Sequence, residues 1–316
     1  MLGGLFLFAA WSVNWLIGQS SDIVLSSENA ETGALRVVVL GDQGTGTLRQ
    51  RQVAWHMDDV AAQLGGFDFA LLAGDNFYGS GVDSIDDPHW RFSFENVYQG
   101  KYLQGLRFYA VIGNHDAKGN VDALLAYSNQ QRGSNRWRLP ARHYIKDFGR
   151  SPTCLACPLL RVVFLDTTQV SSTLAEEAEF VMTAFRDAKS IWRVVIAHHP
   201  IRNYGAHGET ANLAEAFLPA LRESDVHLYI SGHDHNQQII QRAKEPLYLI
   251  SGAGGKKAYP VNTGEKDLLA SSEENGFSVL EFNDQTLSID MYGESDQALS
   301  RTVLAHADNI QIGMVE

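Results

Sequence analysis

The stretch LLAGDNFYGS, Leu71–Ser80, joins an apolar run to a Gly-Asp pair, and a tyrosine follows the aspartate by three positions. A surface turn would account for the aspartate but not for the tyrosine. The same stop, in which a short apolar run ends at Gly, Asp, Asn or His, recurs along the chain. The runs are LRVVVLGD (35–42), FALLAGD (69–75), FYAVIGNHD (108–116), LRVVFLD (160–166), WRVVIAHHP (192–200), VHLYISGHDH (226–235) and LYLISGAGG (247–255). Runs of this kind predict buried strands.

Helical periodicity lies between several of these runs. Three sets of apolar residues each share one helical face: Val53, Met57, Val60, Ala61 and Leu64; Leu174, Ala178, Val181 and Phe185; Leu213, Phe217 and Leu221. We expect Pro219 to kink or shorten the third helix. FSVLEF-NDQT-LSIDMY (277–292) predicts a hairpin, and SRTVLA (300–305) a further strand. The pattern predicts an α/β protein with two packed mixed β-sheets flanked by helices.

The composition is that of a globular protein with a sizeable core, since 45% of the 316 residues are hydrophobic. The formal net charge is −12. A surface this acidic argues against nucleic acid or an anionic membrane as the main partner. Phosphate chemistry stays open, because bound metal ions reverse the local sign of charge.

The N-terminal residues Leu2–Gly18 are mostly apolar. Residues 1–18 predict a secretory signal peptide or an uncleaved membrane anchor facing the extracytoplasmic side, and an extra helix packed on the domain is the alternative. Residues 19–34 then form a polar linker before one catalytic domain over 35–316. Cys154 and Cys157 are the only cysteines, so a four-thiolate zinc site within one chain is excluded. We expect a local disulfide or two unpaired thiols there.

Polar residues end most of the predicted strands. In α/β folds, ligands bind beyond the carboxyl ends of the strands, so these residues are brought to a common edge. They are Asp42, Asp75, Tyr78, Asn114, His115, Asp166, His198, His199, His233 and His235. Burying so many polar groups together is costly unless cations pair with them. Two metal ions that share a bridging aspartate can use this set, and the absence of a thiolate favours iron, manganese or zinc.

Some of these residues stay ambiguous from the sequence alone. His198 and His199 lie on opposite faces of a strand, and the residues do not say which of them binds a metal. Asp116 and Asp166 can orient a ligand or hold the local structure, so we leave both outside the predicted site.

The ordered blocks resemble those of the calcineurin-like metallophosphoesterases, which implies a four-layer sandwich. The blocks are G-D-x-G (41–44), G-D-x-x-Y (74–78), G-N-H-D (113–116), the strand-end His198 and G-H-D-H (232–235). The tyrosine is similar to that of the purple acid phosphatases. GNHDAKGNVDALLAYS, AHHPIRNYGAHGET and SGHDHN followed by LYLISGAGG resemble their small, tartrate-resistant, mammalian-type branch, over roughly residues 35 to 300.

The resemblance implies a role for each matching residue. A ferric ion would be held by Asp42, Tyr78 and His235, and a divalent iron, zinc or manganese ion by Asn114, His198 and His233. His198 is favoured over His199 because it stands two positions before Pro200. Asp75 would bridge the ions, and Tyr78 would bind as a phenolate whose charge transfer to iron gives the family its purple colour. This assignment explains why Tyr78 follows Asp75 by three positions, since both would bind the ferric ion.

The resemblance also implies an acid phosphatase that acts as a monomer on a small phosphomonoester or a phosphoprotein. A metal-bound hydroxide would attack phosphorus, and His115 and His207 would act as general acid or hydrogen-bond donors. One alternative is a phosphodiesterase that acts on cyclic nucleotides or lipid head groups. Another is a non-hydrolytic metal-binding or redox protein, against which the presence of both His115 and His207 argues.

The sequence departs from the family pattern in two places. The segment between Asp166 and Leu174 is very short, so the longer loop that covers the site of mammalian relatives, and is cut to raise activity, is expected to be absent. Ala211 and Asn212 stand where relatives can carry a disulfide cysteine, so Cys154 and Cys157 do not inherit that crosslink.

Overall fold

The computed structural model describes residues 33–168, 171–306 and 313–314. The predicted N-terminal segment 1–18 and nearly all of the linker lie outside these residues. Within the described ranges, every helix is too short or too polar to cross a membrane.

One of the two β-sheets is built mainly from the first and last parts of the chain. Its strands are β1 (Leu35–Leu40), β2 (Phe69–Leu72), β3 (Phe108–Ala110), β4 (Trp137–Arg138), β12 (Phe277–Phe282), β13 (Thr286–Tyr292), β14 (Ala298–Ala305) and β15 (Gly313–Met314). Their order is β15-β14-β13-β12-β1-β2-β3-β4. Strands β1 to β4 pair in parallel, and β12 joins them antiparallel to β1. The predicted hairpin is therefore β12–β13, which extends the sheet.

The other sheet comes from the middle of the chain. Its strands are β5 (Tyr144–Phe148), β6 (Leu160–Phe164), β7 (Trp192–Ile196), β8 (Leu228–Ser231), β9 (Gln237–Gln241), β10 (Leu247–Ser251) and β11 (Leu268–Ser272). Their order is β11-β9-β10-β8-β7-β6-β5. The pairs β6–β7, β7–β8 and β8–β10 are parallel, and β5, β9 and β11 add antiparallel strands. Both sheets are mixed, as the sequence predicts.

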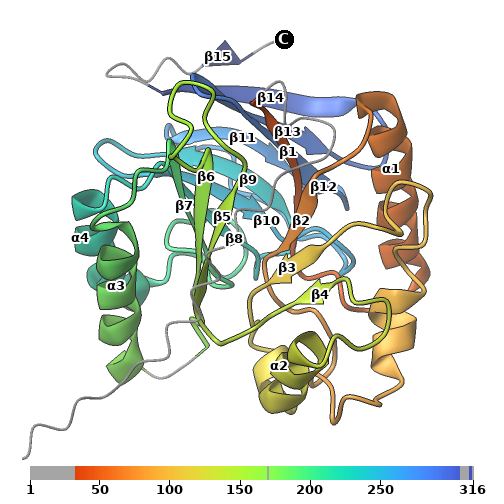
Figure 1. Ribbon diagram of the computed structural model, residues 1–316. Coiled ribbons are helices and arrows are strands. Elements are labelled where there is room, and N and C mark those ends of the chain that lie inside the picture. Colours follow the sequence, from red (N-terminus) through yellow and green to blue (C-terminus); the bar gives the residue numbers. More distant parts are fainter. Residues whose placement is uncertain (1–32, 169–170, 307–312, 315–316) are drawn as a thin grey trace, which may run out of the picture.

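Helices cover the outer faces of the two sheets (Figure 1). They are α1 (Leu48–Leu64), α2 (Val121–Asn129), α3 (Ser171–Phe185) and α4 (Ala211–Glu223). Helices α3 and α4 lie on one side of the sandwich and α1 and α2 on the other, which confirms the predicted fold class. Of the two predicted effects of Pro219, a kink or a short helix, the second does not occur: α4 continues through the proline to Glu223, because Ala220 and Leu221 beyond it are buried in the core.

Alternation along the strands divides the apolar residues between two cores. In β6, Val162 and Phe164 point into the core between the sheets, whereas Val163 packs in the cluster under α3 and α4. The sheets face each other directly, since the rings of Phe69 in β2 and Phe148 in β5 stack with centroids 3.9 Å apart. Two sheets that share one core bring the ends of β1, β2 and β3 close to the ends of β7 and β8.

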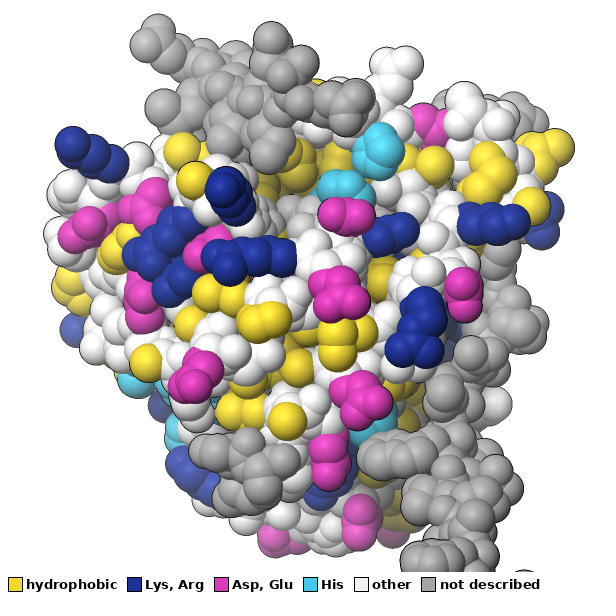
Figure 2. Space-filling view, turned by 90° about the vertical axis from the view of Figure 1, so that its left-hand side faces the viewer, with side chains coloured by type: hydrophobic (Ala, Val, Ile, Leu, Met, Phe, Trp, Pro, Cys, Tyr) yellow, Lys and Arg dark blue, Asp and Glu magenta, His cyan; other side chains and the backbone are white. Residues whose placement is uncertain are grey.

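The outer face over α3 and α4 carries acidic and basic side chains intermixed, with apolar side chains between them (Figure 2). The net negative charge of the chain is therefore not gathered into one patch on this face. The connection between β5 and β6 contains a disulfide between Cys154 and Cys157, which is one of the two states the sequence predicts.

Candidate metal centre

The loops that follow β1, β2 and β8 bring three oxygen and nitrogen ligand atoms together. The Tyr78 hydroxyl donates to Asp42 Oδ1 over 3.0 Å and lies 3.1 Å from His235 Nε2. His235 Nε2 is in turn 3.7 Å from Asp42 Oδ1. All three residues are at most 9% exposed. The three residues expected to bind one ion thus form one cluster, although they come from loops about 190 residues apart in the chain.

The loops after β3, β7 and β8 form a second cluster. Asn114 Oδ1 lies 2.9 Å from His198 Nε2 and 3.1 Å from His233 Nδ1. The two ring nitrogens are 3.2 Å apart. These are the three residues expected to bind the other ion.

Asp75, which follows β2, joins the two clusters. Its Oδ1 atom lies 3.5 Å from His198 Nε2. Asp42, Asp75 and His198 each offer one ligand atom, and these atoms lie within 4.8 Å of one another. The seven side chains predicted from the sequence therefore meet at one place, with Asp75 between the clusters.

The backbone at three of these residues has a conformation that side chains other than glycine seldom adopt. The φ angles of Asp42, Asp75 and His233 are 58°, 52° and 71°. Conformations in this left-handed region cost of the order of 1 kcal/mol or more and gather at functional sites. Each of the three follows a glycine and ends a strand, which turns its side chain back over the sheet edge.

The glycines of the motifs are required by close packing between the loops. A Cβ atom on Gly113 would lie 2.0 Å from the backbone nitrogen of Asp75. A Cβ atom on Gly74, whose φ is 89°, would lie 2.6 Å from His198 Nδ1. The Gly-Asp and Gly-Asn pairs are therefore the means by which the loops come close enough for the clusters to form.

The hydrogen bonds of His198 fit a bound cation. Its Nδ1 atom lies 2.9 Å from the carbonyl oxygen of Ala73, so the ring proton sits on Nδ1 and donates to that oxygen. Nε2 then presents a lone pair, and its neighbours Asn114 Oδ1 and Asp75 Oδ1 are acceptors as well. Three acceptors that face one another without a proton between them suit a metal ion. The set contains carboxylate, phenol, amide and imidazole but no thiolate, which suits hard or borderline ions.

Burial shifts the pKa values of the cluster toward the uncharged forms. It raises the pKa of Asp42 well above its usual range, and the nearby Asp75 carboxylate adds to the effect. Burial and then the carboxylate of Asp42 also raise the pKa of Tyr78. Burial lowers the pKa of His233 to about 2 and that of His235 to about 4. Cations bound here would offset the cost of the buried anions and favour the deprotonated ligands.

His115 and His207 lie on two sides of the centre. The ring of His115 is 4.5 Å from that of Tyr78, and its Nδ1 atom donates to the carbonyl of Gly79 over 2.8 Å. The ring of His207 is 4.3 Å from that of His233, and its Nδ1 atom is 3.3 Å from Asp234 Oδ1. In both histidines it is Nδ1 that bonds the protein.

Asp116 and Asp166, which we left outside the predicted site, both hold loops. The carboxylate of Asp116 accepts from the backbone N–H groups of Gly113, Asn76 and Phe77 at 2.9–3.1 Å, which fastens the Asn114 loop to the Asp75–Tyr78 loop. Asp166 accepts from Arg142 and from the hydroxyl of Thr168. Asp116 is thus a positioning residue of the centre, whereas Asp166 holds the turn that follows β6.

His199 lies beside the centre. Its ring is 4.9 Å from that of His198 and 4.6 Å from that of His233. Together His198, His199 and His233 also offer nitrogens within 4.8 Å of one another. His199 differs from His198 in that its Nδ1 atom bonds the Thr167 hydroxyl at 3.0 Å.

Two further residues at the centre were not predicted from the sequence. The Lys256 ammonium lies 4.3 Å from the centroid of the Tyr78 ring, and the Tyr259 ring stacks on His235 with centroids 4.3 Å apart. Both residues follow the GAGG turn after β10. The backbone N–H of Lys256 donates to the carbonyl of Asp42 over 3.2 Å, which holds this turn against the loop after β1. The GAGGKK stretch lacks the spacing of a phosphate-binding loop, and only the fold shows that it closes over the same edge.

Comparison with known proteins finds one family and several relatives. Residues 35–237 match the family described as Calcineurin-like phosphoesterase. Purple acid phosphatase 17 of Arabidopsis thaliana is 31% identical over 83% of this chain and 82% of its own. Tartrate-resistant acid phosphatase type 5 of Oryctolagus cuniculus is 29% identical over 90% of this chain and 95% of its own. A solved structure described as "GAP50 the anchor in the inner membrane complex of Plasmodium" is 24% identical, with a TM-score of 0.73 over 88% of this chain and 89% of that chain. That likeness concerns the fold alone.

Proposed function

Because the chain belongs to the purple acid phosphatases of the calcineurin-like phosphoesterase family, we propose that it hydrolyses phosphomonoesters at a pair of metal ions. The observation that supports this most is the convergence of seven ligand side chains from five loops into two clusters that share Asp75. Without a cation, the buried carboxylates of Asp42 and Asp75 would repel each other.

The two clusters support the following assignment of ligands. Asp42, Tyr78 and His235 would hold a ferric ion, because a carboxylate and a phenolate suit the harder and more highly charged metal. Asn114, His198 and His233 would hold a divalent iron, zinc or manganese ion, and Asp75 would bridge the two. Bound cations of this kind lower the pKa of a coordinated water and neutralise charge on phosphoryl oxygens.

The two flanking histidines act on the ester. The Gly79 carbonyl holds the His115 ring, and the Asp234 carboxylate holds the His207 ring, each through Nδ1. Both Nε2 atoms are then able to donate to phosphoryl oxygens or to protonate the leaving alkoxide. A leaving group that takes its proton from an imidazolium favours an acidic working pH.

We also propose that residues 1–18 direct the chain to the extracytoplasmic side as a signal peptide or an anchor, and that residues 35–316 form one catalytic domain that acts as a monomer. The disulfide between Cys154 and Cys157 supports an oxidising compartment.

A substrate panel tests the activity. The metal-loaded full chain is assayed on phenyl phosphate and on bis(4-nitrophenyl) phosphate at several acidic pH values. The proposal predicts turnover of the monoester at a kcat/KM at least about a hundredfold above that of the diester. Preference for the diester would make the protein a phosphodiesterase, and no turnover of either by the fully metallated protein would make it a non-hydrolytic metal-binding protein.

A further inference from the structure

A pocket of about 270 Å³ opens beside the centre, on the side of the Asn114–His198–His233 cluster. Asn114 and His199 line it, together with Ala117, which is two residues after His115. Thr210 and Asn212 close another side, and they lie three and five residues after His207. The segments that carry both histidines therefore border the pocket, and a phosphoryl group between those histidines would direct its alcohol toward it.

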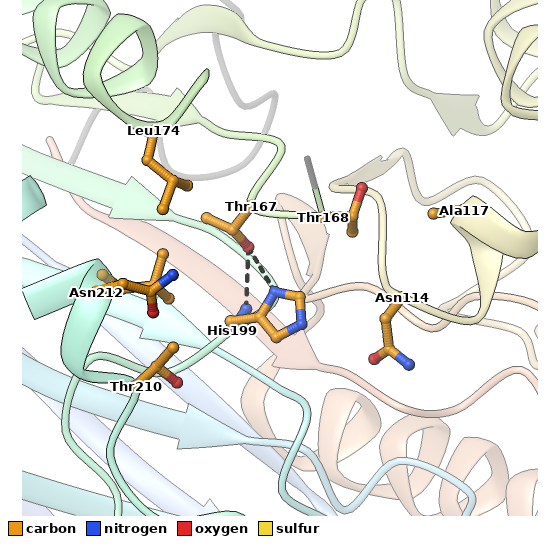
Figure 3. A pocket seen from close by; sticks show the side chains of 9 residues that line it. Asn114, Ala117, Thr167, Thr168, Leu174, His199, Thr210 and Asn212 are labelled. Carbon is orange, nitrogen blue, oxygen red and sulfur yellow. Dashed lines mark hydrogen bonds between the residues drawn. The ribbon is translucent and has the colours of Figure 1, made fainter. Parts of the chain in front are cut away.

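The connection between β6 and α3 contributes two residues to the pocket lining. It runs only from Phe164, the end of β6, to Ser171, the start of α3, and its Thr167 and Thr168 line the wall opposite Asn212 (Figure 3).

The described residues that line the pocket are polar or apolar and include no Asp, Glu, Lys or Arg. Its polar side chains are Asn114, Thr167, Thr168, His199, Thr210 and Asn212, and Leu174 and Leu213 supply an apolar wall. A charged leaving group would lose hydration in this pocket without gaining a partner of opposite charge.

Several of these polar groups are free to bind a hydroxyl group. Among the described residues, the side chains of Thr210 and Asn212 have no hydrogen-bond partner, although Thr210 occupies the N-cap position of α4. The Thr167 oxygen accepts from the backbone N–H of His199 at 3.2 Å and lies 3.0 Å from His199 Nδ1. In Figure 3 the His199 ring lies between Thr167 and Asn114.

The size of the pocket limits the alcohol. A volume of 270 Å³ is roughly the share of nine waters at about 30 Å³ each. It falls just below the range of about 300–1,000 Å³ typical of pockets for drug-sized ligands. A short polyol or a single sugar ring fits this volume.

We propose that this pocket holds the leaving alcohol and selects phosphomonoesters of small, uncharged, hydroxyl-bearing alcohols. The inference rests on the proposed phosphatase activity, since it assigns the part of the substrate that the metal ligands and histidines do not contact. On cleavage of the phosphorus–oxygen ester bond, the alcohol oxygen takes a proton and leaves through the pocket, while water supplies the new oxygen on phosphorus.

A matched pair of substrates tests the selectivity. Glycerol 3-phosphate and 3-phosphoglycerate have nearly the same size and differ by a carboxylate in place of a hydroxymethyl group. For the metal-loaded full chain, we expect kcat/KM to favour glycerol 3-phosphate by at least about tenfold. Equal values, or a preference for phosphoglycerate, would overturn the proposal.

Variants locate the selectivity in the pocket. Thr210→Val and Asn212→Leu remove hydroxyl-binding groups at nearly constant volume, and each should raise KM for glycerol 3-phosphate about three- to tenfold, the range for one lost hydrogen bond. Asn212→Arg should lower the ratio of kcat/KM for glycerol 3-phosphate to kcat/KM for 3-phosphoglycerate by at least about tenfold. The inhibition constant of inorganic phosphate, which lacks an alcohol, should change by less than twofold in all three. Thr183→Val, at an exposed position of α3, is the matched control.

The outcomes separate this proposal from the phosphatase activity itself. If phenyl phosphate is hydrolysed but none of the three variants changes the ratio of kcat/KM for glycerol 3-phosphate to kcat/KM for 3-phosphoglycerate, the pocket does not hold the alcohol. The proposed phosphatase activity is unaffected by that result. If phenyl phosphate and glycerol 3-phosphate both resist the metallated protein, the proposed function fails, and this inference with it.

Discussion

Asp234 lies between two proposed ligands, His233 and His235, and its buried carboxylate holds the loop that carries His207. Its Oδ1 atom accepts from Ala206 N at 3.1 Å, and its Oδ2 atom accepts from His207 N at 3.1 Å and from the Asn203 amide. The ring of His207 adds a bond through Nδ1. Asp234 is thus a positioning residue, because it acts on the ester only through His207.

Asp234→Asn tests that role at constant size. One oxygen becomes an NH2 group that faces N–H donors, so the His207 loop loses its fixed position. We expect kcat on phenyl phosphate to fall about 10- to 100-fold, with a smaller change in KM and the metal content retained. Asp284→Asn is the control, because the Oδ2 atom of Asp284 accepts from the hydroxyls of Ser151 and Thr153, far from His207 in the sequence. A kcat within twofold of the wild type would contradict the positioning role.

Lys256 gives a second prediction for a single residue. Its ammonium over the Tyr78 ring stabilises electron density on that ring, by about 0.5–2 kcal/mol for such pairs. In the iron-loaded protein, Lys256→Met should therefore lower the energy of the Tyr78-to-iron charge-transfer band by about 1–2 kcal/mol and move it to longer wavelength. Lys257→Met, at the exposed neighbouring position, should leave the band in place. A band unmoved in Lys256→Met, or moved equally in both variants, would contradict the prediction.

Single residues also show how far the sequence alone reaches. That the seven proposed ligands lie near one another could be predicted, because each ends or closely follows a predicted strand and the fold brings strand ends together. The choice of these seven, in contrast, came from the resemblance to the purple acid phosphatases. Lys256 and Tyr259 could not be predicted, because their place depends on how the GAGG turn packs on Asp42, a contact between residues about 210 positions apart. The choice between His198 and His199 likewise needs the fold, which shows that His198 Nδ1 bonds the Ala73 carbonyl.

At the scale of elements, the ends of β3 and β2 are packed so closely that Gly113 has no room for a side chain. Gly113→Ala would place a Cβ atom 2.0 Å from Asp75 N, so one of the two loops must move. We expect the free energy of unfolding to fall by about 1–3 kcal/mol, the usual range for overpacking. The metal content should fall as well, because both Asn114 and Asp75 shift.

Gly105→Ala is the control for that variant, since nothing lies within 4 Å of an added Cβ atom there. Urea unfolding and metal analysis of the two variants measure the difference. Equal stability and equal metal content in Gly113→Ala and Gly105→Ala would show that the loops do not require the glycine.

The strands that the sequence misses are those whose polarity breaks the pattern. Strand β9 reads QQIIQ, and Gln237 and Gln238 are fully buried. Their amides are satisfied inside the fold, Gln237 by the carbonyl of Tyr292 and Gln238 by the oxygens of Asn203 and Asn236. Pairing between strands, rather than an apolar sequence, places β9 in the sheet. The seven apolar runs, in contrast, were predicted correctly because burial on both faces leaves few polar residues in them.

At the scale of the whole molecule, one half-buried histidine outside the centre links stability to pH. His227 lies against Trp192 and His306, and its Nδ1 atom accepts from the backbone N–H of Arg193 at 3.0 Å. Burial, and then the neighbouring His306 and Arg193, lower its pKa from 6.5 to about 4. The unfolded chain therefore binds a proton below pH 6.5 that the folded chain excludes until about pH 4.

This histidine should cost the folded state stability as the pH falls through that window. At about 1.4 kcal/mol per pH unit, the loss reaches up to about 3 kcal/mol. His227→Gln keeps an acceptor for the Arg193 N–H but does not titrate. As the pH falls from 7 to 4, we expect the free energy of unfolding of the variant to rise by that amount relative to the wild type. Urea unfolding of both proteins measures this difference, because effects of the metal centre are common to both. Parallel stability curves over this range would contradict the prediction.

The central claim is that side chains from both halves of the sandwich hold a pair of metal ions and that Tyr78 binds one of them as a phenolate. Metal analysis of the purified, iron-loaded chain, with visible spectra of the wild type and of Tyr78→Phe, tests it most directly. We predict a pair of metal ions per wild-type chain and a visible band that disappears in Tyr78→Phe. A single ion or none at saturating metal, or a band that persists without the tyrosine, would contradict it.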